Sequence, residues 1–302
     1  MDFGKLEDIS QVNFTLPPDN PFNRKVLSSE IPKPQPKVYI GPPIWANRDW
    51  VGKIYPSNVK EKDFLYHYTR QFNTIELNVT HYQIPSESTI ERWKESAATG
   101  FKFCPKFPQA ISHDRMLLGC EAMTEEFCTN ILGLGEFLGT TFLQLGPTFE
   151  PKHFRNLESY LRNLPKVLPV AVEFRHPNWF NNPTVWNQVC ETLHDLGVGL
   201  VVSDVSGRRD VLHQTLVTSA FTLRFVGNEL HSTDYQRIDE WNIRLTEWFK
   251  RGLDTAYIFV HCGSNEFAPE LTKYWIRQLN QLGDFGLQEP QIKPQVVQGS
   301  LF

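Results

Sequence analysis

The chain has 302 residues, of which 40% are hydrophobic and 13% aromatic, and its formal net charge is −4. This composition supplies apolar surface for one large core or two small ones, and it gives no overall positive field that attracts nucleic acid or membranes, so any polyanion site must be a local patch. The five cysteines include no CxxC pair, which predicts a reduced protein. We recognise no secretory leader in MDFGKLEDIS and no apolar run of the ~20 residues that span a bilayer, so we expect a cytoplasmic protein outside the membrane.

Residues 1–37 form a Pro-rich N-terminal extension that ends in IPKPQPK and shows no sustained helical or strand period. We expect no regular element there. Four isolated apolar residues would anchor the extension on the surface of the domain: Phe3, Phe14, Leu16 and Phe22. Residues 288–302 are rich in Pro and Gln, which predicts a flexible C-terminal tail. The domain itself is expected over residues 38–287.

Eight short apolar runs predict strands. They are VYIG (38–41), TIELN (74–78), KFCPKF (102–107), TFLQLG (141–146), PVAVEFR (169–175), VGLVVSD (198–204), FTLRFVG (221–227) and AYIFVHC (256–262). Several are apolar on both faces, which is typical of strands that are covered on two sides.

Amphipathic helical patterns lie between most of these runs. Ser88 and Glu91 predict a capping box at the start of one helix. Asn182 and Pro183 predict the start of another, which Gly197 would end. Two further helical patterns, over residues 238–248 and 271–282, are each followed by a glycine.

This alternation predicts a single (β/α)8 TIM barrel, since eight strand–helix units over about 250 residues match that fold in count and length. A doubly wound open sheet is the rival architecture. It would need a glycine-rich phosphate loop after an early strand, and neither GxGxxG nor GxxxxGK[ST] follows any predicted strand.

Charged and polar residues gather at the carboxyl ends of the predicted strands, which meet at one mouth in such a barrel. The catalytic candidates are Glu76, Glu173, His176 and Asp204. The substrate-binding candidates are Trp45, Asn78, Tyr82, Lys106, His113, Gln144, Arg175 and Arg224. Glu173 and Arg224 stand within apolar runs, where an unpaired charge is too costly to keep, so we expect them to be buried and paired or to face a polar site.

The cations among these residues favour an anionic ligand that carries phosphate or carboxylate. Glu76, Glu173 and His176 would then serve as acid–base groups. A divalent metal is conceivable at Glu76, Glu173, Asp204 and His261, but the neighbouring cations oppose it, and any cofactor is unknown. Trp45 belongs to an aromatic cluster that is read either as core packing or as a stacking wall for a sugar or base.

The segments FNTIELNVTHY (72–82) and EFRHPNW (173–179), together with KFP (106–108), QLGP (144–147) and LRFVG (223–227), resemble the YecE-like family, a domain of unknown function numbered 72. The resemblance spans about residues 38–282. It implies a TIM barrel with its site at these segments, and it implies no reaction, because the activity of the family is not established. The eighth strand departs from the family pattern, since FVHCGSN (259–265) stands where the family tends to have Phe-Asn-Asn.

The chain ends in QGSLF, in which Gln298, Leu301 and Phe302 resemble the peptide by which bacterial replication and repair proteins dock on the DNA sliding clamp. Gly299 stands where that peptide usually has Leu, and a tail packed under the barrel is the ordinary alternative. The sequence thus supports three hypotheses. The first is an enzyme, such as a hydrolase, that acts on a phosphate-containing or nucleic-acid substrate in DNA maintenance. The second is an enzyme of a small phosphorylated metabolite. The third is a non-catalytic ligand-binding or scaffold protein.

Overall fold

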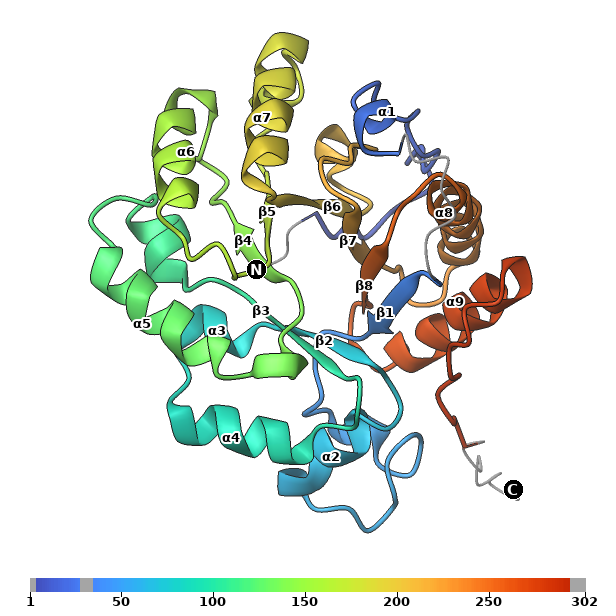
Figure 1. The fold of residues 1–302 in the computed structure, drawn as a ribbon. Helices are drawn as coiled ribbons and strands as arrows, with labels where there is room; N and C mark the ends of the chain where they lie inside the picture. The colour runs from blue at the N-terminus through green and yellow to red at the C-terminus, as the bar shows by residue number, and fades with distance from the viewer. Residues whose placement is uncertain (1–3, 28–34, 294–302) are drawn as a thin grey trace.

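The computed structural model describes residues 4–27 and 35–293, and within them eight strands lie in the middle of the molecule with helices around them (Figure 1). The strands are β1 (Lys37–Gly41), β2 (Thr74–Leu77), β3 (Lys102–Pro105), β4 (Thr141–Gln144), β5 (Val170–Glu173), β6 (Gly199–Asp204), β7 (Ala220–Val226) and β8 (Thr255–His261). Each overlaps one of the eight predicted runs, although β1, β7 and β8 begin one residue earlier, so the prediction of strand positions is confirmed to within one residue at these starts.

The strands form two parallel sheets. Six of them pair in the order β1-β8-β7-β6-β5-β4, and the other two pair as β2-β3. An isolated parallel bridge between Lys106 and Phe142 links the end of β3 to β4. Each strand therefore lies beside its neighbour in the chain, and β8 lies beside β1, which is the order of a TIM-barrel-like α/β fold. The described ladders do not close into a continuous barrel.

The interruption between β1 and β2 has a local cause. The side-chain amide of Asn73, just before β2, accepts a hydrogen bond from the Ile40 N–H at 2.7 Å and donates one to the Val38 carbonyl at 2.8 Å. These are the backbone groups of β1 that a ladder would otherwise use. The backbones of the two strands also approach closely, since a Cβ on Gly41 would lie 2.3 Å from the Thr74 carbonyl oxygen. The side chain of Asn73 thus takes the place of a backbone ladder at the junction between β1 and β2, which we call the seam.

The helices of the described residues cover the strands. They are α1 (Asn23–Val26), α2 (Phe64–Tyr68), α3 (Val79–Tyr82), α4 (Glu87–Ser96), α5 (Glu121–Leu132), α6 (Phe154–Arg162), α7 (Pro183–Leu196), α8 (Ser232–Lys250) and α9 (Ala268–Leu282). Short 3-10 turns are η1 (Arg48–Trp50), η2 (Glu61–Asp63), η4 (Gly135–Phe137), η5 (Pro151–His153), η6 (Pro177–Trp179) and η7 (Arg209–Val211), and η3 (Ala110–Asp114) is a π-helical turn. No helix in the described part of the chain is long and apolar enough to cross a membrane.

Two predicted helix ends are confirmed and one was wrong. Asn182 caps α7 by accepting from the backbone of Thr184 and Val185, and Gly197 ends it in a left-handed conformation with φ of 67°. For α4, however, the capping side chain is Ser86, which accepts from the Thr89 N–H, so the predicted capping box at Ser88 was misplaced by two residues. Ser86 has the extended backbone that an N-cap requires.

The N-terminal segment packs on the domain. Leu16 and Phe22 are buried, and the carboxylate of Asp19 accepts from the indole N–H of Trp248 at 3.1 Å and from Arg244 at 2.6 Å. The expectation of no regular element in residues 1–37 was wrong at α1, a single turn of helix. Contacts with a segment distant in sequence stabilise this turn, because Asn23 donates to the Gln214 carbonyl and accepts from the Leu216 N–H.

Candidate functional site

Strand alternation directs one set of charged side chains to the interior at the carboxyl ends of the strands. Glu173 ends β5, and Glu76 and Arg224 lie near the ends of β2 and β7. The guanidinium of Arg224 donates to both carboxylate oxygens of Glu76, from Nε and Nη2, each at 3.0 Å. Its third nitrogen, Nη1, lies 3.4 Å from Oε1 of Glu173. Arg224 therefore bridges two carboxylates from different strands, and we call these three residues, together with Arg175 and Lys106, the strand-end cluster.

The carboxylate of Glu173 is held on every side. Oε1 accepts from Nε of Arg175 at 3.0 Å and from the hydroxyl of Ser203 at 2.7 Å. Oε2 accepts from the amide of Gln144 at 2.7 Å. On β2, Oε2 of Glu76 also lies 2.7 Å from Nε2 of His261, on β8. The lone pairs of both acids are thus used by neighbours, which fixes the carboxylates in place.

These contacts decide the protonation of the two acids. Burial alone would raise the pKa of Glu76, but Arg224 and His261 more than offset it and hold that pKa well below its usual range. For Glu173 the penalty of burial is likewise outweighed by Arg175 and Arg224, so its pKa is also lowered. Both groups are carboxylates at neutral pH. Their geometry suits the positioning of cations better than the donation of a proton.

Lys106 is the cation of the strand-end cluster without an acid of its own. It is 6% exposed, and no described residue forms a hydrogen bond or salt bridge with its Nζ, which lies 5.6 Å from the centre of the Phe142 ring. Thr80 fixes the backbone of Lys106, accepting from its N–H at 2.9 Å and donating to its carbonyl at 2.7 Å. Burial, followed by the charge of Arg224, lowers the pKa of Lys106 to about 7.

Two histidines stand beside this lysine. Nδ1 of His81, in α3, lies 2.7 Å from the Phe107 carbonyl, and the rings of His81 and His113 are 5.2 Å apart in an edge-to-face arrangement. Burial and the charge of Lys106 lower the pKa of His81 to about 4 and that of His113 below its ordinary value. Both rings are neutral at pH 7. Nδ1 of His81 is then the donor, and Nε2 is left as an acceptor.

A cavity of about 410 Å³ opens over the strand-end cluster. Among the residues that line it are predicted site residues and neighbours of theirs: Asn78, His81, Tyr82, Lys106, Gln144, Arg175, Ser203, Arg224 and His261. Lys5 of the N-terminal segment also lines the cavity, and the Gly4 carbonyl next to it accepts from the Gly207 N–H at 2.8 Å. The N-terminal segment therefore forms part of the cavity wall.

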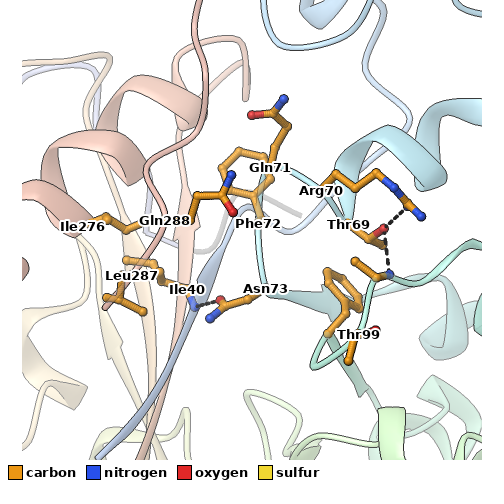
Figure 2. Close-up of a pocket in the computed structure, with 12 residues that line it drawn as sticks. Ile40, Thr69, Arg70, Gln71, Phe72, Asn73, Thr99, Ile276, Leu287 and Gln288 are labelled. Carbon is orange, nitrogen blue, oxygen red and sulfur yellow. Dashed lines mark hydrogen bonds between the residues drawn. The ribbon is translucent and has the colours of Figure 1, made fainter. Parts of the chain in front are cut away.

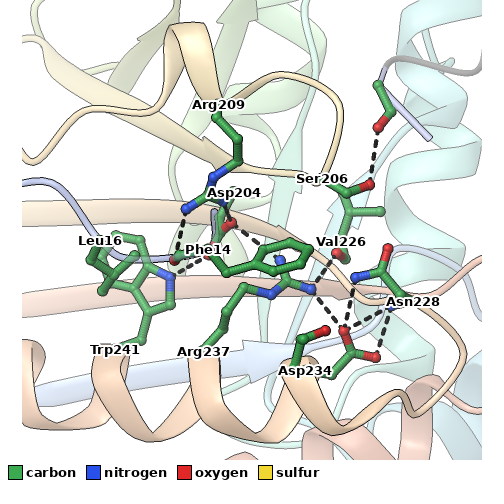
Figure 3. Close-up of polar contacts among 12 residues, drawn as sticks. Phe14, Leu16, Asp204, Ser206, Arg209, Val226, Asn228, Asp234, Arg237 and Trp241 are labelled. Carbon is green, nitrogen blue, oxygen red and sulfur yellow. Dashed lines mark hydrogen bonds and ion pairs between the residues drawn. The ribbon is translucent and has the colours of Figure 1, made fainter. Parts of the chain in front are cut away.

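Asp204 does not join this cluster, although the sequence placed it among the catalytic candidates. Its Oδ2 accepts from the indole N–H of Trp241 at 2.8 Å, and its Oδ1 accepts from Arg237 at 3.1 Å and from Arg209, as Figure 3 shows. The reason is strand alternation: Ser203 faces Glu173 inside, so the next residue faces α8. The ring of Phe14 covers Arg237, with 4.8 Å between the guanidinium carbon and the ring centre.

Three other candidates are not among the residues that line the cavity. Nδ1 of His176 accepts from the Asn178 N–H and so caps the turn η6, and His176 does not line the cavity. Trp45 packs edge-on against Trp93, and its carbonyl accepts from the Tyr55 hydroxyl. His113 lies behind His81 and is likewise not among the lining residues.

Sequence reasoning missed His81, Ser203 and Lys5. The first of these had a signal in NVTHY, because a helical turn that starts at the mouth directs one or two of its side chains back to the strand ends. The contact of Lys5 has no local signal, since it depends on how the N-terminal segment crosses the domain. His261, which the sequence offered only as a metal ligand, instead bonds Glu76.

A second cavity, of about 370 Å³, lies at the opposite ends of the strands, where the seam between β1 and β2 is bridged by Asn73 (Figure 2). Its one charged lining residue is Arg70. The guanidinium of Arg70 already donates to the carbonyls of Tyr66 and Ser96 and stacks on the Tyr66 ring. This cavity therefore offers little for a charged ligand, and the site is better sought at the strand-end cluster.

Neither a metal ligand set nor the clamp peptide is part of the described site. Among the described residues no three His, Cys, Asp or Glu side chains are grouped as a metal would require. Gln298, Leu301 and Phe302, which carry the clamp-docking hypothesis, lie outside the described residues.

Known proteins resemble this chain over most of its length. The family model described as "Protein of unknown function DUF72" matches residues 39–295. The UPF0759 protein YecE of Escherichia coli (strain K12) is 30% identical over 252 residues, which cover 78% of this chain and 89% of that protein. The UPF0759 protein YunF of Bacillus subtilis (strain 168) is 28% identical over 155 residues, 48% of this chain and 53% of that protein.

Two solved structures have a similar fold. A DUF72 family protein from Enterococcus faecalis V583 superposes with a TM-score of 0.61 at 17% sequence identity, covering 84% of this chain and 99% of that one. A DUF72 family protein from Thermotoga maritima MSB8 gives a TM-score of 0.58 at 24% identity, covering 79% and 97%. The resemblance seen in the sequence motifs is confirmed, and none of these names states a reaction.

Proposed function

This chain belongs to the DUF72 family, and because its relatives carry no named reaction, we propose from the site alone that it binds a small anionic molecule, with a phosphate or carboxylate group, over the strand-end cluster. The proposal takes the two sheets as parts of one (β/α)8 barrel, in which the carboxyl ends of the strands open on a common face. The position and the chemistry of this site are those of an enzyme, and Lys106 is its most reactive side chain.

The observation that carries the proposal is an imbalance of charge. The strand-end cluster contains three basic side chains, Lys106, Arg175 and Arg224, against two carboxylates, Glu76 and Glu173. Both acids are already paired with arginine, so a protonated Lys106 is left uncompensated at the edge of the cavity. An anion there would supply the missing charge, and in a buried setting that interaction is strong.

The size of the cavity favours a small ligand. A volume of about 410 Å³ lies in the lower part of the range for small-molecule sites, and Lys5 forms part of the cavity wall. A phosphorylated metabolite therefore fits the site better than a nucleic-acid duplex. A nucleic acid would reach the same cations only through a terminal phosphate, and its case rests on the residues of the C-terminal tail.

The test is a calorimetric titration of the whole protein with inorganic phosphate, comparing Lys106→Met with Lys102→Met. Lys102 lies at the other end of the same strand, where its Nζ bonds the Glu136 carbonyl. We expect the first substitution to weaken phosphate binding about tenfold or more and the second to leave it unchanged, since a charge-assisted hydrogen bond contributes ~1.5–3 kcal/mol. Equal affinities for both variants and the wild type would refute the site.

Two further arms of that titration identify the ligand and the reaction class. A 5′-phosphorylated single-stranded oligonucleotide is compared with phosphate, and binding of the oligonucleotide alone would favour the DNA hypothesis. Hydrolysis of phosphomonoester and phosphodiester substrates, with and without Mg²⁺, then tests the hydrolase reading. A loss of turnover in Lys106→Met but not in Lys102→Met would place the reaction at the strand-end cluster.

A further inference from the structure

We propose that the amine of Lys106 is a nucleophile, and that it forms a reversible imine with an aldehyde or ketone that also carries a phosphate or carboxylate group. The inference rests on the proposed anion site and adds to it a covalent step and a substrate class. Neither the sequence motifs nor the relatives' names assign such a step.

The first observation is that two buried lysines differ in the partners of their amines. Lys53 is 3% exposed, and its Nζ contacts both the Glu266 carbonyl and the Glu270 carboxylate at 2.7 Å. Lys106 is 6% exposed, but its Nζ has neither an acid nor a carbonyl within hydrogen-bond distance among the described residues. The charge of Lys53 is thus fixed by its partners, whereas nothing fixes the charge of Lys106.

The second observation is the set of groups that faces Lys106 from every side. Its charge is influenced by Glu76 on β2, by Glu173 and Arg175 at β5 and by Arg224 on β7, and it acts in turn on His81 and His113 in the helical turns. Burial is the largest of these influences on the pKa of Lys106, and the charge of Arg224 follows it, opposed in part by the two carboxylates. Burial and these cations favour the neutral amine, with a pKa of about 7, and a neutral amine has the lone pair that attacks a carbonyl carbon.

The third observation is the cavity itself, which places the amine beside the positive charge that would hold the anionic end of a substrate. Arg175, Arg224 and Lys106 line the same space. A compound with a carbonyl a few bonds from its anionic group would therefore meet both. Attraction of the anion to the arginines raises the local concentration of the carbonyl at Lys106.

The step balances without an added reactant. The nitrogen lone pair forms a bond to the carbonyl carbon and gives a carbinolamine. The carbonyl oxygen then leaves as water together with the two hydrogens of the amine, and a carbon–nitrogen double bond forms. Neutral His81, with Nε2 as an acceptor, lines the same cavity and is suited to pass these protons.

The experiment traps the imine with sodium borohydride, which delivers hydride to the imine carbon and leaves a stable secondary amine. The full-length protein is incubated at pH 8 with glyoxylate, with glyceraldehyde 3-phosphate or with uncharged glycolaldehyde, reduced, and examined by intact mass and peptide mapping. We expect one adduct, on Lys106, formed at least tenfold faster with the two anionic probes than with glycolaldehyde. Lys53 should stay unmodified, and Lys106→Arg should abolish the adduct.

The outcomes separate this inference from the proposed function. Phosphate binding without any adduct on Lys106 would overturn the imine and leave the anion site standing. An adduct on Lys106 that excess phosphate does not suppress would support the nucleophile and refute the anion site. Modification of Lys53 and the surface lysines at rates similar to that of Lys106 would overturn the inference, because Lys106 would then be no more reactive than other lysines.

Discussion

Nε and Nη2 of Arg224 each donate to an oxygen of Glu76 at 3.0 Å. This ion pair joins two different sheets, because Arg224 lies on β7 in the six-stranded sheet and Glu76 lies on β2 in the two-stranded one. No ladder pairs these strands. The ion pair is buried and is continued to β5 by the contact between Arg224 and Glu173. It therefore holds the two sheets together at their carboxyl ends as well as shaping the site.

The first prediction is that Arg224→Met lowers the free energy of unfolding by about 3–5 kcal/mol, because it leaves Glu76 and Glu173 buried with less positive charge around them. Urea unfolding followed by tryptophan fluorescence measures this. Arg162→Met is the matched control, since its salt bridge to Glu158 is exposed, and there we expect a loss below about 1 kcal/mol. If the two variants lose the same stability, the buried pair does not hold the sheets together.

The second prediction concerns acid. The pKa values of Glu76 and Glu173 are lower in the folded protein than the usual 4.5, so their contribution to stability is complete above about pH 4.5 and is lost as the pH falls below it. We expect a melting temperature that changes little from pH 7 to pH 5 and drops between pH 4.5 and pH 3. In Glu173→Gln the melting temperature should start lower and depend less on pH in that window, whereas Glu158→Gln should follow the wild type.

The third prediction is that Lys106→Met makes the protein more stable. The pKa of Lys106 is about 7 in the folded protein against 10.5 ordinarily, so the cost of burying its charge is full below pH 7 and declines as the pH rises towards 10.5. We expect a gain on the order of 2–4 kcal/mol at pH 6 that shrinks by pH 9.5, measured by urea unfolding at both values. Lys53→Met should instead destabilise the fold, because it leaves Glu270 without its cation. A loss of stability in Lys106→Met at pH 6 would contradict the picture of an uncompensated cation.

The fourth prediction separates Asp204 from the site. Asp204→Asn should lower the free energy of unfolding by about 3–5 kcal/mol, because Arg237 is then buried with less negative charge around it. Phosphate affinity of the folded protein should stay within about twofold of the wild type, since the side chain faces α8 and not the cavity. Calorimetry of the variant at a temperature where it is fully folded measures this. A tenfold weaker phosphate affinity would place Asp204 in the binding machinery after all.

Much of the fold follows from the sequence because β-rich apolar runs and helical periods are local signals. The strand-end residues were found for the same reason: Glu76, Glu173 and Arg224 are charges in apolar runs, and only a polar interior explains them. Local signals did not distinguish Ser203 from Asp204, because the inward face of β6 is set by its neighbours. Nor did they reveal the seam at Asn73, where a side chain takes the place of a ladder.

The attachment of the N-terminal segment affects how the protein is made. The backbone N–H of Leu16 bonds the carboxylate of Glu240 across 224 positions of the chain, and Asp19 bonds Trp248 still further along. On the ribosome, residues 16–19 emerge long before α8 and must wait for it before they reach their final place. Contacts this distant in sequence form slowly, and until they form, both the segment and the α8 face it covers are open to chaperones and to other nascent chains. This segment is thus synthesised well before α8 but reaches its final place only after it.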